Sequence, residues 1–195
     1  MSVIRQLSLF GVEATPPEPG DLAGLLAATG DISRLGGTAR VTIVVDHPWR
    51  ASVLIAECAR RSLVATSVST PDDHIEVRTA YSALLTPLAM AWTDGNGKRA
   101  PRGLLLDGRM LRLWVVAQGR WDGATAYVLP VGYADEPARE PIGAALAAIG
   151  LGAQLVSPRG GLGTSYRIVG KRRIERLVEM IGEPPKHAPN DIWPS

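Results

Sequence analysis

The sequence carries one order of predicted elements twice, on either side of a polar, glycine-rich segment at residues 94–103. Residues 21–93 read as helix, two strands, helix, two strands and helix, because β-branched runs such as 41–45 alternate with apolar helical patterns. Residues 104–183 read as two strands, a helix, two strands and a helix, without a clear leading helix. The repetition predicts a duplicated, pseudo-twofold α+β protein in which each half has one sheet, helices on one face of it and an open opposite face.

The predicted second half begins with a strand at residues 109–117. Arg112 alternates there with Leu111 and Leu113, which is typical of a strand with one apolar face. Helices are predicted at residues 21–30, 48–62, 81–92, 136–150 and 171–182, and strands at 32–35, 39–46, 63–70, 74–80, 109–117, 124–131, 152–157 and 165–170. Asp21 is expected to cap the first helix.

Residues 1–20 form the first of two tails outside the duplicated region, and residues 184–195 form the second, which is proline-rich. Pro16, Pro17 and Pro19 remove backbone donors and favour an extended chain, so the apolar cluster before them is expected to be separate from the fold. That cluster is either a terminus that packs back on the core as an edge strand, or a peptide that a partner protein receives.

The cluster itself has the sequence Gln6, Leu7, Ser8, Leu9 and Phe10. All five positions resemble the consensus by which bacterial polymerases and repair proteins dock on the sliding clamp, the β subunit of DNA polymerase. In such a peptide the glutamine satisfies polar groups at the rim of the pocket, and the leucines and phenylalanine fill apolar clefts. The resemblance implies that the sliding clamp is a partner of this chain.

Residues 22–30 read LAGLLAATG and resemble the signature helix of the LAGLIDADG fold. Within that superfamily the likeness is to the degenerate region of WhiA-type sporulation regulators, carried by the opening DLAGLLAATGDIS and the closing YRIVGKRRIERLVEMIG. Residues 101–108, PRGLLLDG, resemble a worn second copy of their central helix. The resemblance implies an αββαββα repeat and a saddle of two sheets that binds double-stranded DNA. Those regulators continue into a helix-turn-helix domain, which is not expected in a chain that ends at Ser195.

The same resemblance bears on catalysis. Active LAGLIDADG proteins place a carboxylate near the end of each signature helix to hold a divalent metal ion. Ala27 and Thr29 stand at these positions here, residues 142–150 contain no acid, and only Asp107 lies in the worn copy. A single carboxylate is a poor ligand set for magnesium. We therefore expect no catalytic residues, no metal site and no cofactor.

Basic residues in the predicted strands and at the start of the last helix are candidates for contact with DNA phosphates. An alternative is that the helical cluster is only a solvated face, and that the excess of arginine over lysine reflects a GC-rich genome. The net charge of +2 does not decide between them. The candidates are Arg40, Arg78, Arg112 and Arg167 in strands and Lys171, Arg172 and Arg173 in the helix.

Apolar runs are too short and too rich in glycine to span a bilayer, and the single cysteine, Cys58, makes no intrachain disulfide. We expect a cytoplasmic, nucleoid-associated protein. The sequence predicts a non-enzymatic accessory protein of DNA replication or repair that binds the sliding clamp. The alternative is a WhiA-like transcriptional or developmental regulator that binds DNA or a partner factor without the clamp.

Overall fold

The structure, a computed structural model, describes residues 16–95, 97–132, 136–157, 163–189 and 191–194. The first half has the element order predicted from the sequence. Its elements are the 3-10 helix η1 (Pro19–Leu22), α1 (Ala23–Ala27), β1 (Asp31–Leu35), β2 (Thr38–Val45), α2 (Pro48–Ala59), β3 (Ala65–Ser69), β4 (Ile75–Thr79), the 3-10 helix η2 (Ala83–Leu85) and α3 (Thr86–Trp92).

A short hairpin, β5 (Thr93–Asp94) with β6 (Gly97–Lys98), joins the two halves. The second half repeats the order of the first. Its elements are α4 (Gly108–Gln118), β7 (Arg120–Asp122), β8 (Ala126–Val131), α5 (Glu136–Ala148), β9 (Gln154–Val156), β10 (Thr164–Val169) and α6 (Lys171–Ile181).

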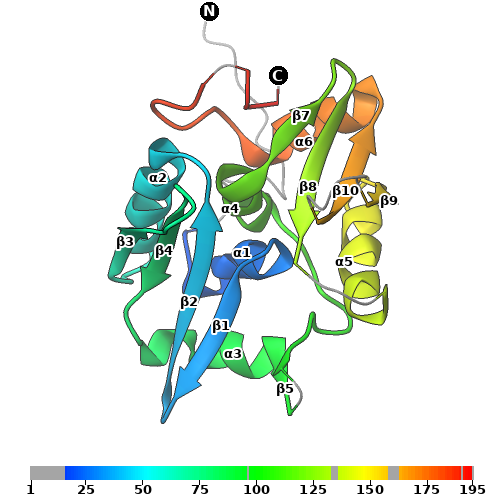
Figure 1. Ribbon diagram of the computed structural model, residues 1–195. Helices are drawn as coiled ribbons and strands as arrows, with labels where there is room; N and C mark the ends of the chain where they lie inside the picture. The colour runs from blue at the N-terminus through cyan, green and yellow to red at the C-terminus, as the bar shows by residue number, and fades with distance from the viewer. Residues whose placement is uncertain (1–15, 96, 133–135, 158–162, 190, 195) are drawn as a thin grey trace, which may run out of the picture.

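Each half contains one four-stranded antiparallel sheet, with the strand order β1-β2-β4-β3 in the first and β7-β8-β10-β9 in the second. Figure 1 shows α1 and α4 in the middle of the molecule, with one sheet on either side of this helix pair. The identical strand order confirms the predicted duplicated α+β fold. No helix within the described residues is long and apolar enough to span a bilayer.

The leading helix of the second half is α4, and the strand predicted at residues 109–117 is wrong. Asp107 caps this helix, because its side chain accepts hydrogen bonds from the backbone N–H groups of Arg109 and Met110, both at 2.9 Å. Residues 101–108, which resemble a worn copy of a central helix, are helical only at Gly108, the residue that follows this cap. The helix is buried on nearly all sides, so its apolar residues do not follow one helical face and instead resemble a buried strand.

The two central helices pack very closely at Gly24. A Cβ atom added there would lie 1.9 Å from the carbonyl oxygen of Met110, so any side chain would collide with the backbone of α4. The glycine of the LAGLL run is thus required by the contact between the halves, and not by its own backbone conformation.

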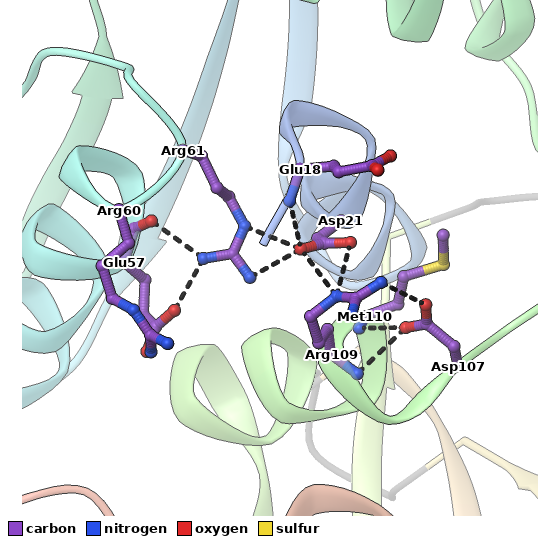
Figure 2. A network of polar contacts seen from close by, with 8 residues as sticks. All are labelled: Glu18, Asp21, Glu57, Arg60, Arg61, Asp107, Arg109 and Met110. Atoms are coloured by element: carbon purple, nitrogen blue, oxygen red, sulfur yellow. Dashed lines mark hydrogen bonds and ion pairs between the residues drawn. The ribbon is translucent and has the colours of Figure 1, made fainter. Parts of the chain in front are cut away.

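A buried ion network joins the same two halves (Figure 2). The Asp21 carboxylate lies 2.8 Å from Nη2 of Arg61, which follows α2, and 3.1 Å from Nε of Arg109 in α4. These three residues are each less than a tenth exposed. Glu57 and Asp107 add further pairs to the two arginines at 2.6 Å and 3.3 Å. Asp21 also accepts the backbone N–H of Glu18 at 3.0 Å. Its main contacts are the ion pairs with Arg61 and Arg109, and not the cap of the first helix that the sequence predicts.

Replacing Asp21 by asparagine leaves two buried guanidinium groups without their shared carboxylate. We expect Asp21→Asn to lower the free energy of unfolding by about 1.5–3 kcal/mol, because charge-assisted hydrogen bonds to two buried arginines are lost, while Glu57 and Asp107 still offset the arginine charges. Urea denaturation measures this change. The matched control is Glu179→Ala, which breaks the 2.8 Å pair with Arg176 on the surface of α6 and should cost about 1 kcal/mol or less. Equal losses in the two variants would contradict the prediction.

Candidate functional site: the open faces of the two sheets

The open face of the first sheet is defined by alternation along β2. Ala39, Val41, Ile43 and Val45 are buried against the helices, so the residues between them point to the opposite face. Residues directly opposite each other in antiparallel strands share a face, and Arg78 of β4 lies opposite Thr42. The open-face residues of the first sheet include Asp31, Ser33, Arg40, Thr42, Val44, Thr66, Val68, Glu76 and Arg78.

The open face of the second sheet follows from the same rule. Tyr166 and Ile168 of β10 belong to the core, so Arg167 between them points to the other face. Arg167 lies opposite Val128, and Arg120 of β7 also lies opposite Val128. The two arginines therefore flank one valine on the open face.

Arg78 and Arg167 occupy equivalent places in the two sheets. One row of paired residues crosses the first sheet as Asp31, Thr42, Arg78 and Thr66, and the matching row crosses the second as Arg120, Val128, Arg167 and Gln154. Each arginine has an acidic partner on its own sheet. Arg78 lies 3.8 Å from Glu76, and Nε of Arg167 lies 2.6 Å from Asp122. The structure thus brings two sequence-predicted cations to corresponding positions.

Arg40 lies on the same face as Arg78, two residues along β2 from Thr42. Its guanidinium carbon lies 4.2 Å from the centroid of the Tyr81 ring, and the Tyr81 hydroxyl lies 3.3 Å from Oγ of Ser33. This stacking holds the Arg40 side chain against the sheet.

Arg112 does not lie on an open sheet face, and its predicted strand position is wrong. It projects from α4, where Nη1 donates to the carbonyl oxygens of Ile181 at 2.8 Å and Glu183 at 2.6 Å. Its guanidinium also lies 5.2 Å from the centroid of the Trp193 ring. The physical reason is the helical period of residues 108–118, which turns Arg112 toward the C-terminal segment.

Lys171, Arg172 and Arg173 are exposed in the first turn of α6. This helix packs against β10 and α4, so the three residues are not on the open face that carries Arg167. Lys171 lies 3.8 Å from Glu175, and Nη1 of Arg173 donates to the carbonyl oxygen of Val169 at 3.2 Å. The predicted clamp-binding residues, Gln6, Leu7, Ser8, Leu9 and Phe10, lie outside the described residues.

Thr29 and Gln118 stand at equivalent ends of the two central helices. Each precedes a glycine, Gly30 or Gly119, after which the first strand of its half begins. The Gln118 amide donates to Oγ1 of Thr29 and, at 3.2 Å, to the carbonyl oxygen of Val44. Its Oε1 accepts the N–H of Thr29 at 3.3 Å. The ends of α1 and α4 thus meet through two neutral side chains that are hydrogen-bonded to each other.

A cation contacts each of these helix ends, and it is partly buried at α1 and buried at α4. Lys98 donates to the carbonyl oxygens of Leu26 and Gly30 at the end of α1. Arg50 donates from Nη1 to those of Val115 at 3.1 Å and Val116 at 2.7 Å at the end of α4. Carbonyl groups in the last turn of a helix have no partner within the helix and carry partial negative charge, so cations stabilise them.

Sequence reasoning missed both caps, because each cation lies far along the chain from the carbonyl groups it contacts. Burial lowers the pKa of Arg50, and the Asp46 carboxylate at 2.8 Å opposes this shift. Burial also lowers the pKa of Lys98 to about 8, with Asp31 partly offsetting the shift.

The divalent cation implied by the LAGLIDADG resemblance does not fit these helix ends. Magnesium prefers carboxylate oxygens, whereas Thr29 and Gln118 are neutral and bind each other. Lys98 and Arg50 place positive charge at the same two ends. Within the part of the chain that the structure describes, no group of three or more histidine, cysteine, aspartate or glutamate residues is arranged to hold a metal ion.

Comparison with known proteins reveals similarity of fold. No protein-family model matches this sequence, and a search of curated proteins gives no match. The N-terminal LAGLIDADG domain of DUF199/WhiA superposes with a TM-score of 0.60 at 15% identity, covering 95% of this chain and 97% of that one. Full-length DUF199/WhiA from Thermatoga maritima gives the same TM-score and identity over 86% of this chain and 56% of its own length.

A third solved structure is the homing endonuclease I-WcaI bound to its DNA recognition sequence. It superposes with a TM-score of 0.60 at 11% identity over 86% of this chain and 82% of its own. These likenesses establish that the chain has a LAGLIDADG-type fold.

The partly buried position of Lys98, which lowers its pKa, predicts a pH dependence of stability. In the unfolded chain a lysine has a pKa of about 10.4, so between about pH 8 and pH 10 the unfolded state binds more protons than the folded state. Raising the pH through this window should therefore stabilise the protein relative to Lys98→Met. Urea unfolding of both proteins at several pH values measures the difference. The control Lys186→Met removes an exposed lysine, and a pH dependence as large for this variant would contradict the prediction.

Proposed function

We propose that this protein is a non-enzymatic, DNA-associated accessory protein of replication or repair that docks on the sliding clamp through residues 6–10. The observation that carries the DNA part is the equivalent placement of Arg78 and Arg167 on the two open sheet faces. Arginine suits phosphate contacts because its planar fork presents several N–H donors. The I-WcaI structure, which has the same fold, holds DNA, and that likeness supports a duplex as the ligand of these faces.

The proposal of no nuclease activity is supported by the ends of the central helices. Hydrolysis of a phosphodiester in this fold family uses a carboxylate-bound metal ion to polarise the phosphoryl oxygen and to activate water. Thr29 and Gln118 supply no carboxylate, and Lys98 and Arg50 already neutralise the helix ends. DNA would be held without being cut. Binding to chromosomal DNA would place the protein at the nucleoid.

The clamp part of the proposal is supported by the sequence of residues 6–10 and by the prolines that follow. Burying Leu7, Leu9 and Phe10 yields roughly 1.5–3 kcal/mol each, against about 1–2 kcal/mol of backbone entropy for each residue ordered. The surplus is small, so the peptide alone should bind with an affinity on the order of micromolar. Because a clamp encircles DNA, simultaneous contact of the folded region with the duplex would add avidity.

A second candidate is a regulator that works like WhiA through DNA or a partner factor, without the clamp. The observation that favours it is the near-complete mutual coverage of this chain and the N-terminal domain of DUF199/WhiA. A protein that binds duplex DNA but not the clamp would support this candidate over the first.

The DNA proposal predicts that Arg78→Ala combined with Arg167→Ala weakens binding to a duplex of any sequence. If each arginine contacts one phosphate, the slope of log affinity against log salt should fall by about 1 for each contact removed. Fluorescence anisotropy at several salt concentrations measures this. The matched control, Arg60→Ala with Arg99→Ala, removes the same charge from exposed sites away from the open-face rows. Equal affinities and slopes for both double variants would contradict phosphate contact by the sheets.

The clamp proposal predicts that Leu9→Ala combined with Phe10→Ala lowers affinity for the sliding clamp by at least about tenfold, since two apolar anchors are lost. Ser8→Ala is the control, because a small residue suffices at that position. Calorimetric titration of the purified clamp with intact protein, both variants and a chain lacking residues 1–15 measures binding. Unchanged affinity without residues 1–15 would overturn the docking proposal while leaving DNA binding untouched.

A further inference from the structure

The open face of the second sheet contains a hollow with a volume of about 550 Å³. The hollow crosses all four strands of this sheet rather than lying between the two halves. Its lining includes Arg120, Asp122, Val128, Gln154, Ser165 and Arg167. Apart from Val128, each of these six side chains carries a polar or charged group.

Ser165 lies at the floor of the hollow. It is 1% exposed, and its Oγ has no hydrogen-bond partner among the described residues. A buried hydroxyl without a partner costs free energy, so native proteins nearly always satisfy one with protein, water or ligand. A ligand with acceptor oxygens entering the hollow would satisfy it.

Two cations converge on the same space. Arg120 and Arg167 both lie opposite Val128, so they stand on the two strands that flank it, about 10 Å apart at the backbone. Long arginine side chains can close that gap from both sides. Asp122 contacts Nε of Arg167 at 2.6 Å, which fixes this guanidinium while its two terminal amino groups keep further N–H donors.

The first sheet lacks this arrangement. The position equivalent to Arg120 is Asp31, so the matching row there contains one acid and one arginine instead of two arginines. The pair of arginines is thus specific to this row of the second sheet, and the general duplication of the fold does not explain it.

We infer that this hollow is a phosphate-binding site, in which Arg120 and Arg167 hold the anion and Ser165 donates its hydroxyl proton to a phosphate oxygen. Two sources share this chemistry, the phosphate of a free nucleotide and a backbone phosphate of nucleic acid. With nucleic acid as the source, the inference rests on the proposed function, in which Arg167 contacts DNA, and adds Arg120 and Ser165 to that contact. With a free nucleotide as the source, it goes beyond the proposed function.

The test is a set of NMR titrations of the full-length protein, which follow the Ser165 amide and the Arg120 and Arg167 side-chain signals. The probes are inorganic phosphate, adenosine monophosphate and a short DNA duplex. We expect saturable shifts of these signals, with affinity reduced about tenfold or more in Arg120→Gln and several-fold in Ser165→Ala. Arg60→Gln, which removes an exposed arginine away from the open-face rows, should leave this binding unchanged.

Saturation by adenosine monophosphate identifies a free nucleotide as a source, and saturation by the duplex alone identifies the nucleic-acid backbone. The inference is overturned if none of the three probes shifts these signals, or if Arg120→Gln, shown to be folded by its NMR spectrum, binds as tightly as the unaltered protein. Duplex binding that shifts signals of the first sheet, but not those of Ser165, Arg120 and Arg167, would overturn the inferred phosphate site. The proposed DNA association would then remain intact.

Discussion

The buried carboxylate of Asp21 is the interaction on which the arrangement of the two halves depends. It accepts charge-assisted hydrogen bonds from Arg61 of the first half and Arg109 of the second, at the point where α1 approaches α4 (Figure 2). Each arginine is further paired with its own acid, Glu57 or Asp107. The network fixes the central helices at one end, and the close approach of Gly24 to Met110 fixes their spacing. The sheets are placed by this helix pair.

The opposite ends of the central helices have a different chemistry. Thr29 and Gln118 bind each other, and Lys98 and Arg50 satisfy the carbonyl groups of the last turns. Those contacts join the ends of the helix pair through groups of this chain, and the two side chains that meet there, Thr29 and Gln118, are neutral. The functional proposals consequently rest on the open sheet faces and on residues 6–10.

Most of the fold was predictable from the sequence because its strands are rich in β-branched residues and its turns contain glycine or proline. The β5–β6 hairpin and β7 were not predicted, and the main error is α4, where Leu111, Arg112 and Leu113 alternate like a strand although Asp107 caps a helix. Nearly all of α4 is buried, and its continuous apolar run Leu113–Ala117 resembles a buried strand as much as a helix. That error also placed Arg112 on a sheet face, whereas it binds the C-terminal segment.

The sequence by itself determined the duplication, the placement of Arg40, Arg78 and Arg167 in strands, and the absence of acids from the LAGLLAATG stretch. These depend on local spacing and residue type. Only the tertiary structure decided that Arg78 and Arg167 are equivalent, that Lys98 and Arg50 cap the central helices, and that Arg120 joins Arg167 over one hollow. Each of these depends on strand register or on contacts between residues far apart in the chain, and neither leaves a local pattern in the sequence.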